Sequence, residues 1–232
     1  MTSITLTFSE DSLSASYTLE DLQNIYDLFP DNSQLYALHY NTEHLNITVP
    51  EAWLLIIKNP FNNSDSIYSE IYNSTYCTVQ EKKSSNKKLA PKKARKTLFF
   101  SDYGSEIFST EYGINVRNFP SLVSLYSQIY AFSSFSHSSE YISTIEANYY
   151  PNIHRTNIRN SFTLPRPKNI TYCLGETIPL TFQWFCRGIA ITPKVTFELE
   201  SGDIYVMSEK TMGCNSKKLS DTSLRHYVGL AN

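Results

Sequence analysis

Apolar and polar residues alternate through most of the second half of the chain, which predicts a β-rich domain. Six segments have either the two-residue period of a half-buried strand or the short apolar run of a buried one, with Gly, Pro and Asn between them. The predicted strands are residues 142–150, 169–174, 178–185, 194–199, 204–208 and 222–228. Several short strands separated by turn residues are typical of a double-sheet jelly roll, the architecture of cupins.

The strands 194–199 and 204–208 flank the tripeptide Ser201-Gly202-Asp203. Glycine gives this position the backbone freedom that a tight turn needs. The two segments are therefore predicted to be strands joined by a tight turn, as in an ordinary β-hairpin.

Three segments have the period of an amphipathic helix instead. Residues 18–29 place Thr18 at an N-cap with Asp21 three positions later, and residues 119–132 carry Pro120 in the first turn. A short helix is predicted to begin at Pro50. The residues expected to be buried are Leu22, Ile25, Tyr26 and Phe29 in the first helix, Trp53, Leu54 and Ile57 at Pro50, and Leu122, Val123, Leu125, Tyr126, Ile129 and Tyr130 in the last.

The length and charge of the chain limit its class. At 232 residues it is long enough for one large core, and its formal net charge of -2 excludes a strongly basic protein. Only 7 glycines fit a strand-rich chain better than one built on dinucleotide-binding turns. The longest apolar run, residues 52–57, is too short to cross a bilayer and the start of the chain has no signal-peptide pattern, so we expect a soluble protein of the cytoplasm or nucleus that does not bind a membrane.

Four cysteines are widely spaced and form no CxxC pair, which favours free thiols over disulfides or a zinc site: Cys77, Cys173, Cys186 and Cys214. Residues 59–88 are rich in Asn, Ser, Tyr and Lys and are predicted to form a long irregular loop. The loop leads into a basic strip from Lys82 to Lys96. Such a strip is either a surface for nucleic-acid phosphates or a solvated loop, and composition leaves both open.

Five strings in the C-terminal part stand out: ARKTLFFSD at 94–102, EANYY at 146–150, LGETIPLTFQWF at 174–185, GDIYVMSEK at 202–210 and LRH at 224–226. Together they resemble the AlkB-like 2-oxoglutarate/Fe(II) dioxygenases, in particular a compact subgroup found in large DNA viruses and scattered eukaryotes. The resemblance covers residues 88–229. It implies a mainly β fold of the α+β kind, a double-stranded β-helix (jelly roll) at 88–232. The resemblance does not reach residues 1–87, which are expected to form a helical and loop extension.

The resemblance also implies oxidative removal of alkyl groups from nucleobases with Fe(II) and 2-oxoglutarate as cofactors. In this family the iron is held by an HxD pair and a later histidine, and an arginine clamps 2-oxoglutarate. His226 matches the later histidine, and Arg225 and Arg166 are the candidate carboxylate clamps. Counting back from Leu174-Gly175 places Ser161 and Thr163 at the two HxD ligand positions.

The loss of that pair is not a matter of alignment, because residues 147–175 contain no Asp or Glu. A divalent cation among the arginines of this window would be repelled. The sequence therefore predicts a catalytically degenerate member of the family. A replacement pair of Glu146 and His154 is the remaining route to an iron site, although their spacing does not suit one face of a strand.

Three hypotheses remain open. The chain is an oxygenase, a non-catalytic module that binds anions or nucleic acid on the same fold, or a decayed copy whose segment around Ser161 is corrupted; Pro165 and Pro167 favour the last. For the binding module, the predicted nucleic-acid contacts are Lys92, Lys93, Arg95, Lys96, Arg155 and Arg159.

Overall fold

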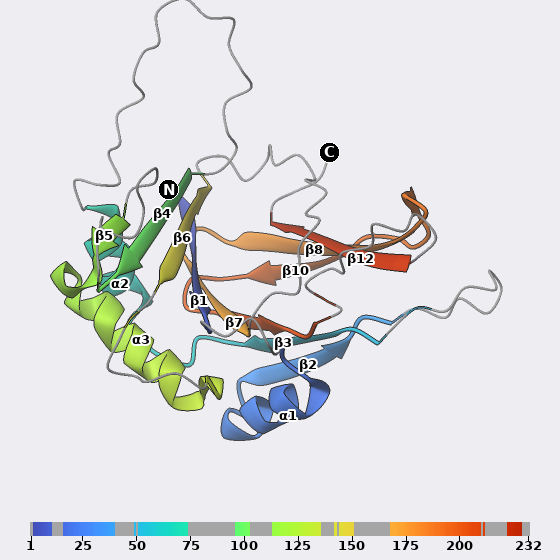
Figure 1. Cartoon of the computed structure of the whole chain (residues 1–232), viewed down its shortest axis with the longest axis horizontal. Helices are drawn as coiled ribbons and strands as arrows, with labels where there is room; N and C mark the ends of the chain where they lie inside the picture. Colours follow the sequence, from blue (N-terminus) through green and yellow to red (C-terminus); the bar gives the residue numbers. More distant parts are fainter. Residues whose placement is uncertain are drawn as a thin grey trace, which may run out of the picture.

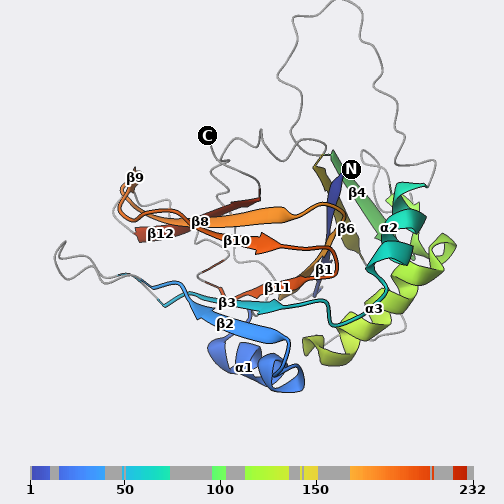
Figure 2. The ribbon, with the colours of Figure 1, turned by 180° about the vertical axis from the view of Figure 1, so that it is seen from behind.

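Two β-sheets lie one above the other in the computed structural model of the chain (Figures 1 and 2). The structure describes residues 2–10, 16–39, 49, 51–73, 96–102, 113–135, 142, 144–150, 168–209, 211 and 222–228. Within these residues the large sheet has eight strands, in the spatial order β2 (Ser33–Ala37), β3 (Trp53–Ile57), β11 (Ile204–Met207), β7 (Asn169–Leu174), β1 (Ser3–Ser9), β6 (Ile145–Tyr150), β4 (Lys96–Ser101) and β5 (Gly113–Asn115). The small sheet has four, β10 (Val195–Leu199), β8 (Ile178–Cys186), β12 (Thr222–Val228) and β9 (Ile189–Ala190), which also pairs with β8. The protein is thus mainly β.

Strand β1 lies in the middle of the large sheet although it comes first in the chain. Leu6 is opposite Ala147 of β6 on one side and opposite Tyr172 of β7 on the other, and both pairings are antiparallel. Strands β2 and β3 belong to the same sheet. The sheet therefore crosses the boundary that the sequence placed between residues 87 and 88.

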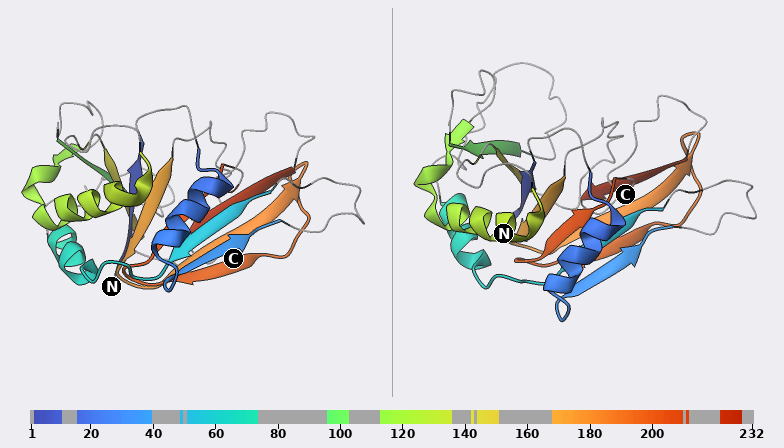
Figure 3. Two further views of the ribbon diagram at one scale, coloured as in Figure 1. Left: turned by 90° about the horizontal axis from the view of Figure 1, so that it is seen from below. Right: turned by 60° about the horizontal axis from the view of Figure 1, so that its bottom comes forward.

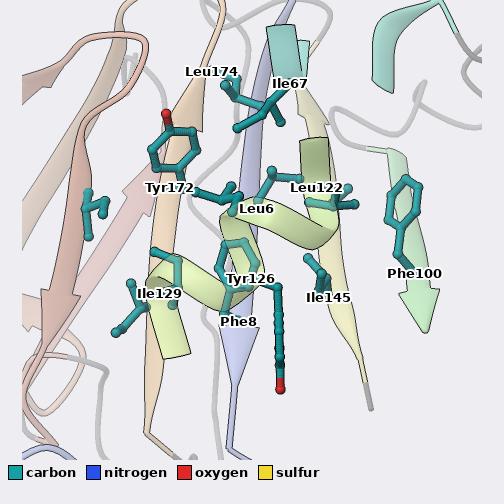
Figure 4. Packing of buried hydrophobic residues seen from close by; sticks show 14 of the residues in the cluster. Leu6, Phe8, Ile67, Phe100, Leu122, Tyr126, Ile129, Ile145, Tyr172 and Leu174 are labelled. Atoms are coloured by element: carbon teal, nitrogen blue, oxygen red, sulfur yellow. The ribbon is translucent and has the colours of Figure 1, made fainter. Parts of the chain in front are cut away.

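Three helices within the described residues cover the face of the large sheet that points away from the small one: α1 (Leu19–Leu28), α2 (Ser64–Tyr72) and α3 (Pro120–Ser133), the last preceded by a 3-10 turn at Val116–Asn118. Because the sheet curves, α1 lies beside β2 and β3 while α2 and α3 lie beside β7, β1, β6 and β4 (Figures 1 and 3). Leu6 and Phe8 of β1 meet Leu122 and Tyr126 of α3 in this core (Figure 4).

A second apolar core fills the space between the two sheets. Ile178, Leu180 and Phe182 of β8 face Leu54 and Ile56 of β3 there. At one end of this layer the indole N–H of Trp184 donates to the backbone carbonyl of Leu38 at 2.6 Å, which fixes the small sheet to the β2–β3 connection.

The helices predicted at 18–29 and 119–132 are confirmed as α1 and α3. Thr18 accepts a hydrogen bond from the backbone of Asp21, and the Asp21 carboxylate accepts one from the backbone of Thr18, which forms the expected capping box. Pro120 stands in the first turn of α3. All six predicted strands are present, as β6, β7, β8, β10, β11 and β12.

The helix predicted at Pro50 is wrong. Residues Trp53–Ile57 form β3, which pairs with β2 on one side and β11 on the other. A run of five consecutive apolar residues fits a strand that is buried on both faces, and no polar position in it marks a helical period. Its neighbour β11 comes from almost 150 residues later, which explains why local sequence gave no sign of the pairing.

The long irregular loop predicted at 59–88 is also wrong in part. Residues 64–72 form α2, which buries Ile67 and Ile71 against the large sheet, and the Glu70 carboxylate accepts hydrogen bonds from the first turn of α3. The two buried residues of α2 are one helical turn apart, and the segment 59–88 around them is rich in Ser, Tyr and Asn. For this reason its composition did not indicate a helix. Residues 74–95 of the predicted loop and basic strip lie outside the described residues.

The turn at Ser201-Gly202-Asp203 is present, but its strands do not form a hairpin with each other. Strand β10 belongs to the small sheet and β11 to the large one, so the turn carries the chain between layers. Gly202 has a φ of +97°, and a Cβ there would lie 2.3 Å from the Asn59 side-chain oxygen. The buried Asp203 carboxylate accepts hydrogen bonds from Lys58 Nζ at 2.6 Å and from the backbone N–H of Glu200 at 2.8 Å.

Candidate functional site

His226 lies on the face of β12 that points toward the large sheet. It is opposite Phe182 in the register of the small sheet, and the two rings are 5.9 Å apart. Leu224, two residues earlier on the same face, is buried in the core between the sheets. Because side chains alternate along a strand, His226 is directed into the space between the two sheets, with its Nδ1 atom shielded from solvent.

Arg225 lies on the opposite face of the same strand. It pairs with Gln183 in register, and its guanidinium carbon is 4.1 Å from the centre of the Phe185 ring. This ring is on the side of β8 that faces away from the large sheet, because β8 buries its even-numbered residues between the sheets. The structure therefore does not bring Arg225 and His226 together.

The large sheet presents hydroxyl and amide groups on its inner face around β1. Thr5 Oγ1 is 3.5 Å from the hydroxyl of Tyr150, and Thr7 Oγ1 is 3.3 Å from Thr171 Oγ1. Thr5 and Thr171 are buried. Uncharged groups that bind one another in this way can be buried at little cost, since each donor keeps a partner.

Glu146 adds a carboxylate to the same face of the sheet. It is half-buried on β6 and accepts a hydrogen bond from Asn148 Nδ2 at 2.8 Å, while Asn148 Oδ1 accepts one from Thr97 of β4 at 2.8 Å. Asn148 orients the carboxylate and was not singled out from the sequence. The signal was available, because Glu146 and Asn148 alternate with apolar residues in EANYY.

The described residues do not fit the iron site of the resembled family. Among them no three His, Cys, Asp or Glu side chains gather at one point that could hold a metal ion. Ser161 and Thr163 at the two ligand positions, Arg166 and His154 all lie outside the described residues. Cys173 on the inner face of β7 is a free thiol, and burial, with a smaller contribution from the nearby Asp203 carboxylate, raises its pKa and keeps it protonated, whereas metal binding requires a thiolate.

The described residues do not supply a clamp for 2-oxoglutarate either. A dicarboxylate needs a cation, preferably an arginine that can bind it with two hydrogen bonds. Arg225 faces away from His226. Three further cations in the described part of the chain are engaged in ion pairs elsewhere, Lys58 with Asp203, Lys168 with Asp21 and Arg117 with Asp102, and Arg187 and Lys194 are exposed near the β8–β9 turn.

The string MSEK at 207–210 contributed to the family resemblance. Its residue Ser208 has a structural role. Ser208 Oγ accepts a hydrogen bond from the backbone N–H of Trp53 at 2.9 Å and lies 3.0 Å from Thr211 Oγ1. The Thr211 hydroxyl donates to the Trp53 carbonyl at 2.8 Å. These contacts fasten the end of β11 to the start of β3.

The predicted nucleic-acid contacts fall mostly beyond what the structure describes. Lys92, Lys93, Arg95, Arg155 and Arg159 are outside the described residues, and of Lys96 only its place in the backbone of β4 is described. Among the described helices none is long and apolar enough to cross a membrane. Cys186, like Cys173, is a free thiol, as expected.

Comparison with known proteins finds a distant relative. Over 231 residues the chain is 27% identical to the uncharacterized protein R156 of Acanthamoeba polyphaga mimivirus. This alignment covers 92% of the present chain and 85% of the mimivirus protein. No model of a known protein family matches the chain. No solved structure matches it either.

Proposed function

We propose that the two sheets form a jelly roll of the AlkB-like kind. In support, the chain crosses between the layers three times after β7: β7 is in the large sheet, β8 and β10 are in the small one, β11 is in the large one and β12 is in the small one. This exchange of strands between facing sheets is typical of a jelly roll. Of the strings that resemble the family, three fall on strands of this arrangement, β8, β11 and β12, and two fall on β4 and β6 of the large sheet.

On this fold the protein acts as a non-catalytic binding module for nucleic acid. The observation that carries the proposal is the make-up of the layer that His226 faces: the inner face of the large sheet offers hydroxyls, amides and the Glu146 carboxylate, but the described residues hold no group of three that could bind a metal ion, and Arg225 points to the other side. Iron in a site of this family needs a second imidazole and a carboxylate. The sequence window 147–175, where the family has them, contains no acidic residue.

The basic segments indicate the chemical class of the ligand. Lys92, Lys93, Arg95 and Lys96 precede or begin β4, and Arg155, Arg159 and Arg166 follow β6, which is the neighbour of β4 in the sheet. Two groups of basic residues that adjoin neighbouring strands in the sequence favour a polyanionic ligand over a small neutral one. Each contact with a phosphate releases counterions, so binding is expected to weaken steeply with salt.

Binding to a fluorescent oligonucleotide in the presence of EDTA tests this function. We expect binding without metal, and a marked loss of affinity when Arg155, Arg159 and Arg166 are all replaced by Gln. A matched control, Asn24→Asp with Ser69→Asp and Ser124→Asp, makes the same change in net charge at exposed helix positions and should bind as the unchanged protein does. Equal affinity of the arginine variant and the control would reject the proposal.

A second candidate, the oxygenase, is favoured by the inward orientation of His226. It predicts release of succinate from 2-oxoglutarate when Fe(II) and methylated DNA or RNA are supplied. We expect no release above that of the His226→Ala variant, because the described residues include no group of three His, Cys, Asp or Glu side chains that could hold the iron. Turnover that depends on both Fe(II) and His226 would establish the oxygenase instead.

A further inference from the structure

One surface of the small sheet is basic although the chain as a whole is slightly acidic, with a net charge of -2. The described residues 178–199 and 222–228 contain Arg187, Lys194 and Arg225 and one acidic residue, Glu198, which is opposite Pro179 at the other end of β10. Arg187 and Lys194 are exposed, and Arg225 is half-buried. The β8–β9 end of this sheet lies on the side of the molecule opposite α2 and α3 (Figure 2).

These cations are placed around one side of the sheet by its strand register. Arg225 is opposite Gln183, and both lie on the face that points away from the large sheet. The Gln183 amide donates to the carbonyl of Thr192 at 2.8 Å, which brings the segment leading to Lys194 alongside. Arg187 begins the turn two residues after Phe185, at a φ of +51°. We call these five residues, Gln183, Phe185, Arg187, Lys194 and Arg225, the Arg225 face.

The Arg225 face combines charge with an aromatic stack. The guanidinium of Arg225 lies over the Phe185 ring at 4.1 Å, which holds its plane in one orientation. Single-stranded nucleic acid is bound by bases stacked on aromatic rings or guanidinium planes, together with cations that contact the phosphates. Since a guanidinium has five N–H donors, it can bind a phosphate in addition to other contacts.

Two exposed apolar side chains lie near the same end of the sheet but on its other face, because Ile189 is opposite Cys186 and Val195 is opposite Phe182, both even-numbered residues of β8. Ile189 on β9 is 71% exposed and Val195 on β10 is 49% exposed. Both are at the β8–β9 end, beside Arg187 and Lys194. An anionic membrane would also suit cations next to apolar residues, but it would make no use of a stacked Arg–Phe pair or of the neighbouring Gln183 amide.

We propose that the Arg225 face binds single-stranded nucleic acid, with Arg187 and Lys194 on phosphates and the Arg225–Phe185 stack beneath a base. This inference rests on the proposed function and adds a second contact surface to it, on the side of the small sheet away from His226. Arg225 thereby has a role that differs from the carboxylate clamp expected by resemblance.

The experiment measures binding of the full chain to a labelled single strand of about a dozen nucleotides, within the range typical of small single-strand sites. Affinity is followed as a function of salt. We expect Arg187→Gln with Lys194→Gln to weaken binding at low salt and to reduce the slope of log affinity against log salt by about 1.4, since each phosphate contact on a single strand contributes about 0.7.

A second variant tests the stack separately from the charge. Phe185→Leu keeps the net charge and an apolar side chain but removes the ring beneath Arg225. We expect a loss of affinity of about tenfold with little change in the salt slope, because stacking does not release counterions. Circular dichroism and thermal unfolding of this variant establish that it remains folded.

The control variant Asn24→Asp with Ser124→Asp changes the net charge by the same amount as the double Gln variant, at exposed positions of α1 and α3. It should bind as the unchanged protein does.

If the unchanged protein binds and the Arg225-face variants bind equally well, this inference is overturned while the proposed function stands. If the unchanged protein binds no oligonucleotide, both fail, and tighter binding to phosphatidylserine vesicles than to the oligonucleotide would assign the surface to a membrane.

Discussion

The side chains of two neighbouring residues of β12 point to opposite sides of the small sheet. Arg225 and His226 were both assigned to one cofactor site because they match one family string, yet alternation along β12 directs them to different surfaces. The sequence contained the signal for this separation, since adjacent residues of a strand cannot share a face. It did not contain the partner of Arg225, because Phe185 lies 40 residues earlier and becomes a neighbour only through the β8–β12 pairing.

The Asp21 side chain takes part both in a helix cap that was predicted from the sequence and in an ion pair with a residue far along the chain. Within α1 it completes the capping box with Thr18, and across the fold its carboxylate lies 3.2 Å from Lys168 Nζ, just before β7. Burial alone would raise the pKa of Asp21, but hydrogen bonds from Thr18 and Lys168 outweigh burial and lower it below the usual 3.8.

A carboxyl group whose pKa is lower in the folded state stabilises the fold above its unfolded pKa and loses this effect as the pH falls through the folded value. Asp21→Asn is therefore expected to cost about 1 kcal/mol of unfolding free energy at neutral pH. The difference from the unchanged protein should shrink as the pH falls below about 3.8. Urea unfolding at several pH values measures it, and a difference independent of pH would contradict the role of the charge.

At the scale of elements, β1 is the strand on which the large sheet depends. It is the central link between β6 and β7, and its apolar side chains Ile4, Leu6 and Phe8 are fully buried under the helices. The alternation of these three residues with Ser and Thr was visible in the sequence. Its significance was missed because both partner strands lie about 140 residues or more away.

Leu6→Ala should therefore destabilise the protein by about 2 to 5 kcal/mol, the range for a leucine removed from a packed core. Leu28→Ala is the matched control, because Leu28 is 61% exposed at the end of α1 and should change stability by less than about 0.5 kcal/mol. Chemical denaturation followed by circular dichroism measures both. Similar small effects would mean that β1 is not a core strand, and the absence of any cooperative transition in the unchanged protein would favour the decayed copy.

At the scale of the whole molecule, the large sheet is shared by two cores. Its outer face is covered by α1, α2 and α3, and its inner face packs against the small sheet. Segments from the first 57 residues contribute to both cores, through Leu6 on one side and Leu54 on the other. The part of the chain expected to be a helical and loop extension therefore supplies strands to the body of the protein.

The sequence by itself determined the elements whose signals are local. The capping box at Thr18 and Asp21, Pro120 at the start of α3 and the alternation in β7 and β12 all act within one or two turns or along one strand, so short-range patterns sufficed. Only the tertiary structure decided that Trp53–Ile57 is a strand, that β10 and β11 separate into different sheets, and that Arg225 turns away from His226. These outcomes depend on partners far along the chain, and a strand's pairing is set by the burial and backbone hydrogen bonds that those partners provide.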